Sequence, residues 1–325
     1  MVNSVDWQKK VGNQRDWVWR GWQTRYTYIR PQNPKNNSSS SRPLMLLHAF
    51  GASIGYWQHN LEIFAKEHTV YALDMLGFGA SEKAPANYSI DLWVEQIYDF
   101  WKTFVRKPVV LIGNSIGSLI SLAAAVKYPE MVEGLVMMSL PDPNLEKEAI
   151  PAFLYPLVAT IKNFVANPLL VKSVFHFIRQ PSMLRRGATL AYANPEAITD
   201  ELIDILAIPT QDKGAANALT ALVLAQNNPN YSPNVKKLLS SLNIPTLMIW
   251  GDKDKIIPPK LASEFVRHNE NIQLLTLKNV GHFPHYESPE QLNQVILDWI
   301  ESVNSVSVAC PGGTYSEQLS VNSEQ

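Results

Sequence analysis

The 325-residue sequence predicts an α/β protein with a doubly wound, mostly parallel sheet and a helical lid insertion. Short apolar segments alternate with segments whose apolar residues recur at helical spacing, as in parallel strands joined by crossover helices. Residues 140–243 break this alternation, because they contain apolar helical stretches and prolines but no convincing strand. A Gly-x-Ser-x-Gly pattern at 113–117 stands where one of the strands runs into a helix.

The first part of the chain is predicted to contain an edge hairpin and two inner strands. Aromatic and polar residues alternate over 17–29, as in an antiparallel hairpin at the edge of a sheet. A loop rich in Ser, Asn and Pro follows at 33–42, and we expect it to be mobile. Residues 44–47 and 69–74 are predicted strands, with a helix around 57–65 between them.

The next part carries a helix, the Gly-x-Ser-x-Gly turn and a strand. Ser89 or Asp91 is expected to cap a helix, because the following apolar residues keep helical spacing: Trp93, Ile97, Phe100, Trp101 and Phe104. The apolar run from Val109 predicts a buried strand, and the small and apolar residues after Gly117 predict a helix packed on the sheet. A further strand is predicted at 134–138.

The C-terminal part returns to the alternation of strands and helices. Residues 245–250 and 273–277 are predicted to be two more buried strands. Ser288 opens a capping box with proline at the first helical position, so we expect the last helix to begin there. Its apolar face consists of Leu292, Val295, Ile296, Trp299 and Ile300.

These elements divide the chain into a core domain that is interrupted by the insertion. The core is predicted to comprise residues 1–139 and 244–303, and the helical lid residues 140–243. Residues 304–325 are polar and rich in Ser and Gly, so they are predicted to form a disordered tail.

Composition limits the classes of partner and compartment. The 28 Lys and Arg residues balance 29 Asp and Glu residues, and the net charge of -1 gives no electrostatic basis for binding nucleic acid. The single cysteine, Cys310, excludes an internal disulfide and disfavours a thiolate metal site. The N-terminus lacks the apolar run of a signal peptide, and no segment reaches the length of a membrane span. We therefore expect a protein that is not secreted, and that is cytoplasmic or peripheral on a membrane.

Ser115 is the predicted nucleophile. A serine at the tip of a sharp strand-to-helix turn projects its hydroxyl freely. The flanking Gly113 and Gly117 are needed because a Cβ at either position would collide with the neighbouring strand or helix. The pattern alone is weakly specific, but the strand before it and the helix after it supply the context that it requires.

A serine hydroxyl needs an adjacent base, which an acid must orient. In this topology the order along the chain should be Ser, acid and His, each at the carboxyl end of a strand. One late strand runs into Gly251-Asp252-Lys253-Asp254, and the next runs towards Gly281-His282. We predict His282 as the base and Asp254 as the acid, since the third position after Gly251 is where this loop turns its carboxylate inward.

The other acids and histidines receive simpler interpretations. Asp252 is expected to form an Asx-type turn, and Asp142 is a weaker alternative acid. His285 is close enough in sequence to His282 to line the pocket, but a surface or supporting position is favoured. The remaining histidines lie on helices or at strand starts with no acid partner in the pattern: His59, His68, His176 and His268.

Two backbone N–H groups are expected to stabilise the oxyanion of a tetrahedral intermediate. One follows the nucleophile, at Ile116. The other is assigned to Phe50, in the loop His48-Ala49-Phe50-Gly51 that follows the strand at 44–47.

These motifs together resemble the α/β-hydrolase superfamily. The matching segments are HAFG at 48–51, DMLGFGAS at 74–81, GNSIGS at 113–118, WGDKD at 250–254 and VGHFPH at 280–285. The resemblance covers about residues 17–303 and implies the α/β-hydrolase fold and a Ser-His-Asp triad, without a metal or an organic cofactor. Serine at position 115 disfavours the dehalogenase and soluble epoxide hydrolase branches, which need aspartate there. Ala49 departs from the glycine most often found in the family, which asks for a slightly different loop conformation.

Three segments resemble a narrower group, the chlorophyll dephytylases of cyanobacteria and chloroplasts, which are related to pheophytinase. The segments are WVWRGWQTRYTY at 17–28, HAFGASIGYWQHN at 48–60 and GNSIGS at 113–118. This resemblance implies hydrolysis of the phytyl ester of a chlorophyll-type pigment, and a location in the cytoplasm or on the thylakoid membrane.

The insertion is rich in apolar residues and poor in acids, which fits a hydrophobic ester substrate. Phe153 and Phe164 are candidate substrate-binding residues of a lid that could line an apolar cleft over Ser115. Its basic residues could rest on anionic lipid: Lys162, Lys172 and Arg179. The same apolar residues could instead only pack the lid on the core, since any lid must bury one face.

The sequence therefore predicts a serine carboxylic-ester hydrolase that acts through an acyl-enzyme intermediate. A general carboxylesterase or lipase, or a carbon–carbon bond hydrolase, would use the same triad. A receptor-like α/β-hydrolase with slow turnover is the rival from another class, although the lid is longer than such receptors usually need.

Overall fold

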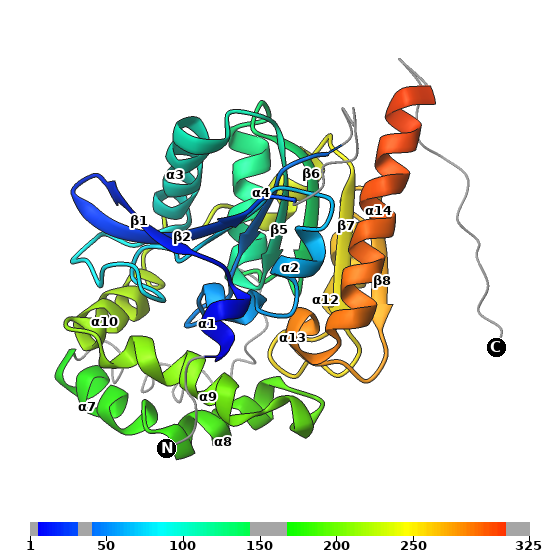
Figure 1. The fold of residues 1–325 in the computed structure, drawn as a ribbon. Helices are drawn as coiled ribbons and strands as arrows, with labels where there is room; N and C mark the ends of the chain where they lie inside the picture. The colour runs from blue at the N-terminus through cyan, green and yellow to red at the C-terminus, as the bar shows by residue number, and fades with distance from the viewer. Residues whose placement is uncertain (1–5, 32–40, 144–167, 310–325) are drawn as a thin grey trace.

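The computed structural model describes residues 6–31, 41–143 and 168–309, and these form an eight-stranded sheet in the order β1-β2-β4-β3-β5-β6-β7-β8 (Figure 1). β2 is antiparallel to both of its neighbours, and every other neighbouring pair is parallel. The predicted doubly wound, mostly parallel sheet is confirmed.

The strands lie close to their predicted positions. β1 (Gln14–Trp19) and β2 (Trp22–Ile29) form the predicted edge hairpin. Its turn residues Arg20 and Gly21 both have positive φ, of 49° and 87°, which suits the twist of a two-residue hairpin turn. The predicted loop at 33–42 lies mostly outside the described residues. The inner strands are β3 (Leu44–Leu47), β4 (Val70–Leu73), β5 (Val109–Asn114), β6 (Val132–Met138), β7 (Thr246–Gly251) and β8 (Ile272–Leu277).

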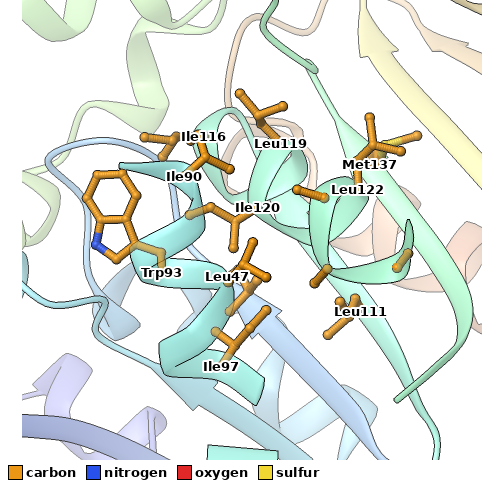
Figure 2. Packing of buried hydrophobic residues seen from close by; sticks show 14 of the residues in the cluster. Leu47, Ile90, Trp93, Ile97, Leu111, Ile116, Leu119, Ile120, Leu122 and Met137 are labelled. Atoms are coloured by element: carbon orange, nitrogen blue, oxygen red, sulfur yellow. The ribbon is translucent and has the colours of Figure 1, made fainter. Parts of the chain in front are cut away.

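Alternate side chains of the inner strands bury the two faces of the sheet. Met45 and Leu47 belong to the core that packs under α3 (Ile90–Phe100) and α4 (Ile116–Lys127). Leu44 and Leu46 belong to the core under α2 (Leu61–Phe64) and α14 (Pro289–Ala309). Figure 2 shows the first of these cores, to which Trp93 of α3 and Ile120 of α4 both belong. Successive side chains of a strand point to opposite faces of the sheet, and here both faces are buried, as a doubly wound sheet requires.

The helices between β3 and β5 differ in detail from those expected. Ser89 is the cap of α3, because its hydroxyl accepts a hydrogen bond from the amide of Leu92 at 3.1 Å. After Phe100 the chain continues as a π-helical turn, η2 (Trp101–Val105). The single helix predicted around 57–65 is instead two short elements, η1 (Ile54–Trp57) and α2. Gln58 and Asn60 lie between these two elements. The side chain of Gln58 donates to the Tyr286 hydroxyl and that of Asn60 to the Asn293 side chain, so tertiary contacts hold the break.

The described residues of the insertion between β6 and β7 contain helices and loops but no strand. Its elements are α7 (Pro168–Ile178), α8 (Pro181–Ala191), η4 (Pro195–Ala197), α9 (Asp200–Ala207), η5 (Ile208–Gln211), α10 (Ala215–Ala225) and α11 (Val235–Ser240). The helices α7 to α10 form a layer at one end of the sheet (Figure 1). By contrast, α11 packs its Val235 and Leu239 into the core beside α4. The boundaries at 140 and 243 stay predictions.

The remaining helices are α1 (Asp6–Lys10), α12 (Lys260–Val266), α13 (Pro284–Glu287) and α14, which begins at Pro289 as predicted. The predicted start of the disordered tail at residue 304 is wrong, because α14 continues to Ala309. The first helix-breaking residues come only at Pro311 and Gly312. Among the described helices, none is both long and apolar enough to cross a bilayer.

Candidate active site

Ser115 lies at a sharp turn between β5 and α4. Its φ of 54° and ψ of -121° are strained for a residue with a side chain. A Cβ on Gly113 would overlap the backbone of Gly117, and a Cβ on Gly117 would overlap the carbonyl oxygen of Leu47. The predicted steric reason for both glycines is confirmed.

Hydrogen bonds from the neighbouring strand hold this turn in place. The amide of Ser115 donates to the carbonyl oxygen of Met138 at 2.8 Å. The buried Ser118 hydroxyl accepts from the amide of Met138 at 2.9 Å and lies 2.8 Å from the carbonyl oxygen of Gly113. These bonds to β6 compensate the strained backbone, so the hydroxyl of Ser115 is presented by a rigid frame.

The structure brings the predicted acid and base together. His282 Nδ1 lies 2.9 Å from Asp254 Oδ2, and both side chains are buried. The other carboxylate oxygen, Oδ1, accepts the amides of Ile256 and Ile257, each at 2.9 Å. Because an ionised carboxylate only accepts, Nδ1 of His282 carries the hydrogen and Nε2 is left as an acceptor.

Ser139 completes the surroundings of Asp254, and sequence reasoning missed it. Its hydroxyl donates to Asp254 Oδ2 at 2.8 Å, and its φ is 50°. Its amide donates to the carbonyl oxygen of Ile249 at 3.1 Å, which ties the end of β6 to β7. The only available signal was its position, directly after a predicted buried strand.

Asn114 links the predicted nucleophile to the predicted base. Its side-chain amide donates to the backbone oxygen of His282 at 3.0 Å, so the residue before Ser115 holds the loop that carries His282. Among the described residues, no hydrogen bond joins the Ser115 hydroxyl to the His282 ring. Such bonds are often long without substrate and tighten when substrate binds.

The alternative acids take no part in this pairing. His282 Nδ1 binds Asp254 rather than Asp142 or Asp252. Asp252 Oδ1 accepts the amide of Asn279 at 2.7 Å, which joins the loops after β7 and β8. Asp252 does lie in a turn, since the amide of Asp254 donates to the carbonyl oxygen of Gly251 at 3.2 Å, but the predicted Asx type is wrong because its carboxylate accepts the amide of the distant Asn279.

The two predicted oxyanion donors flank the elbow. Phe50 follows β3 and Ile116 is the first residue of α4, where helix geometry leaves the amide without an intrahelical acceptor. Within the described ranges, neither amide donates to a protein group. Ala49 stands where the family most often has glycine, but its φ is not positive. Its side chain therefore causes none of the strain that a left-handed backbone conformation would impose.

Two buried titratable residues that the prediction did not assign hold the loop after β3. His48 Nε2 accepts the amide of Met75 at 3.1 Å, and its Nδ1 lies 2.8 Å from the carbonyl oxygen of Ala49. Burial lowers the pKa of His48 to about 4, so the ring is neutral at pH 7. The neutral ring accepts at Nε2 and donates at Nδ1, which ties the Phe50 loop to the loop after β4.

Asp74 provides a second tie between the same two loops. Its carboxylate accepts the amides of Ile54 and Ala80, both at 2.7 Å, and burial raises its pKa to about 6. The DMLGFGAS segment was a signal for the family but did not reveal this role. A cavity of about 220 Å³ lies beside Asp74, and neither Ser115 nor His282 lines it.

Glu287 joins the His282 loop to the lid, and it too was missed. Its Oε1 accepts the amide of Gly281 at 3.0 Å, and its Oε2 accepts the amide of Ala193 at 2.7 Å. The amide of His282 in turn donates to the carbonyl oxygen of Ala191 at 2.8 Å. The end of α8 is thereby held against the base.

His285 is fully buried, so of the surface or supporting position that the sequence favoured, the surface alternative is wrong. Its ring centroid lies 4.3 Å from that of Trp57. Burial, together with the smaller effect of the nearby His282, lowers the pKa of His285 to about 3. Neither ring nitrogen has a hydrogen-bond partner among the described residues. His285 packs behind the His282 loop as an uncharged ring.

We expect the burial of His285 to make the protein acid-sensitive. Between the unfolded pKa of about 6.5 and the folded value, only the unfolded chain binds the proton, so the free energy of unfolding falls as the pH falls. The contribution is about 1.4 kcal/mol per pH unit below pH 6.5. Urea unfolding of His285→Gln should show a shallower pH dependence than the wild type. His176→Gln, at an exposed histidine, is the matched control. Equal slopes in the wild type and His285→Gln would contradict the prediction.

The candidate lid residues Phe153 and Phe164 lie outside the described residues, so their contacts with substrate stay predictions. No group of three or more His, Cys, Asp or Glu side chains in the described ranges is arranged to hold a metal ion.

Comparison with known proteins agrees with this fold. The model of a family described as having the alpha/beta hydrolase fold matches residues 42–289. Lipase 1 of Psychrobacter immobilis is 28% identical over 262 residues, which are 79% of this chain and 76% of the lipase. The 2-hydroxy-6-oxo-6-(2'-aminophenyl)hexa-2,4-dienoic acid hydrolase of Metapseudomonas resinovorans is 26% identical, over 81% of this chain and 85% of that enzyme. The crystal structure of a membrane phospholipase A, a bacterial virulence factor, has the same fold, with a TM-score of 0.72, 23% identity and coverage of 92% and 89%.

Proposed function

The chain belongs to the α/β-hydrolase family, and we propose that it is a serine hydrolase that cleaves hydrophobic carboxylic esters. The observation that carries the proposal is the hydrogen-bonded Asp254–His282 pair, held by Asn114 beside the strained elbow of Ser115. This arrangement supplies a nucleophile, a base with a free Nε2 and an acid that fixes the base.

The proposed reaction has two halves. Ser115 Oγ attacks the ester carbonyl carbon while His282 Nε2 takes the hydroxyl proton, and the amides of Phe50 and Ile116 donate to the oxygen that becomes negative. Collapse of this intermediate breaks the bond to the alcohol, which leaves with the proton from His282. Water then attacks the acyl-enzyme with the same base, which releases the acid and restores Ser115.

Two features support a hydrophobic substrate. Phe50, beside the proposed oxyanion site, is more than a third exposed, and its ring packs against that of Phe78 at 5.2 Å. A relative with 28% identity is a lipase. Within this class we propose the phytyl ester of a chlorophyll-type pigment as the specific substrate. The support for it is the resemblance of segments 17–28, 48–60 and 113–118 to the dephytylase group.

We expect catalytic efficiency to rise with the length of the hydrocarbon chain. Each buried CH₂ contributes about 0.8 kcal/mol, so a long chain offers more selectivity than contacts at the ester itself. A series of nitrophenyl esters from acetyl to palmitoyl measures this rise. Detergent-dispersed chlorophyll, followed by chromatography for free phytol and chlorophyllide, extends the series to the proposed substrate, with Ser115→Ala as the enzyme control.

The outcomes separate the parts of the proposal. A preference for acetyl esters would rule out the hydrophobic substrate but not the proposed ester hydrolysis. Turnover of long nitrophenyl esters without release of phytol from chlorophyll would rule out only the chlorophyll-type pigment as the substrate.

A carbon–carbon bond hydrolase is the second candidate, because a relative with 26% identity is a dienoic acid hydrolase. It would use the same triad on a vinylogous diketone. Assaying such a diketone beside a nitrophenyl ester decides between them, and turnover of the diketone alone would overturn ester hydrolysis.

A further inference from the structure

The lid helix α7 exposes an apolar stripe to solvent. Its Val171 and Phe175 are buried, and α7 packs against α10. Val174, Phe177 and Ile178 are 39%, 55% and 40% exposed, and their spacing of three and four residues places them on one side of the helix. Exposed apolar residues that gather on one helix face commonly mark an interaction surface.

This stripe lies on the outside of the lid. Figure 1 shows α7 and α8 at the edge of the molecule that faces away from the sheet. Leu190 near the end of α8 is also exposed, at 63%. The apolar side chains of this surface are therefore available to a partner that approaches the lid end of the protein.

The charges within residues 168–191, which contain α7 and α8, are of one sign. The helices α7 and α8, with the two residues between them, contain four basic residues and no Asp or Glu: Lys172, Arg179, Arg185 and Arg186. Arg185 is paired with Asp200 of α9, and Arg179 donates to the carbonyl oxygen of Thr210. Lys172 and Arg186 add cationic groups to a chain whose net charge is only -1. The outer helices α7 and α8 are thus locally cationic, whereas α9, which contacts α8, carries Asp200, Glu201 and Asp204.

We propose that the outer surface of α7 and α8 docks on an anionic lipid bilayer. An amphipathic helix lies in the plane of the interface, with its apolar side chains among the headgroups and acyl chains and its basic residues extended to lipid phosphates. A second copy of the chain fits this surface less well, because a two-fold dimer would bring the same cationic residues face to face. The docking is independent of which ester the enzyme cleaves.

The proposal is tested with the full chain and vesicles of phosphatidylcholine, with or without phosphatidylglycerol. We expect cosedimentation with the anionic vesicles, much weaker binding to the neutral ones, and loss of binding at high salt. Val174→Ser combined with Phe177→Ser should weaken binding at least tenfold. Lys172→Gln and Arg186→Gln should each weaken it by about fivefold, which corresponds to about 1 kcal/mol per cation near the surface.

Val18→Ser is the matched control for the apolar change. Val18 lies on the edge strand β1, away from the lid, and is 68% exposed, so the same substitution removes an exposed valine elsewhere (Figure 1). The melting temperature shows that each variant is folded.

Binding that ignores lipid charge, or an equal loss in Val18→Ser and in the α7 variant, would overturn the proposal. So would an absence of vesicle binding, or a dimer in solution that the α7 substitutions dissociate. None of these results depends on ester turnover, so the docking and the proposed activity fail separately.

Discussion

Replacing Ser115 by alanine is expected to lower ester turnover by about 10³-fold or more, with little effect on folding. Without its Oγ, no acyl-enzyme can form, and only substrate binding and the oxyanion donors remain to assist water. The fold should tolerate the change, because Ser115 stands at the tip of a turn and its side chain accepts no bond that holds the sheet. The hydrogen bond from its backbone amide to the carbonyl oxygen of Met138 is unaffected by the substitution.

The measurement is a steady-state assay with a nitrophenyl ester, beside a melting curve. A fluorophosphonate probe should label the wild type at Ser115, and it should not label the variant. Ser240→Ala, at an exposed serine of α11, is the matched control and should keep full activity. Full activity in Ser115→Ala, or labelling at another serine, would show that the nucleophile has been assigned to the wrong residue.

Asp254→Asn is expected to lower kcat by about 10⁴-fold. The two amides that bind Oδ1 of Asp254 would keep the new side-chain oxygen in that position. The new NH₂ would then face His282 Nδ1 as a donor, which forces the hydrogen of the ring onto Nε2. A ring in that tautomer cannot accept the proton of Ser115, so the base is lost while the geometry stays.

Asp252→Asn is the matched control, because it makes the same chemical change two residues away. Its side-chain oxygen can still accept the amide of Asn279, so we expect activity within a few-fold of the wild type. Measuring kcat and kcat/KM for both variants checks the assignment. The reverse order of effects would mean that Asp252, rather than Asp254, orients His282.

Most of the fold and the core of the candidate site could be predicted from local sequence pattern. Short apolar runs identify the inner strands, alternation identifies the edge hairpin and helical periodicity identifies the helices, because each element buries its own apolar side chains whatever its neighbours are. The elbow was predictable because its Gly-x-Ser-x-Gly pattern stands between an apolar strand and a helix, although the Leu47 carbonyl oxygen that excludes a Cβ at Gly117 comes from a distant strand. Asp254 and His282 were predictable because the ends of parallel strands meet at one edge of the sheet.

Other features of the site were decided only by the tertiary structure. Ser139 and Asp254 are 115 positions apart, and nothing in either segment shows that the Ser139 hydroxyl will bind the Asp254 carboxylate. The burial of His285 against Trp57 and the break of the helix predicted at 57–65 depend likewise on which surfaces meet across the sheet.

The physical reason for this division is the range over which each requirement acts. Periodicity, backbone conformation and topological order are set by neighbouring residues, so the chain by itself determined the α/β architecture and the order of Ser115, Asp254 and His282. The satisfaction of buried polar groups is not local, since any donor that folding brings within about 3 Å will serve. The partners that hold the acid, the base and the oxyanion loop were therefore decided only when the strands and loops had packed together.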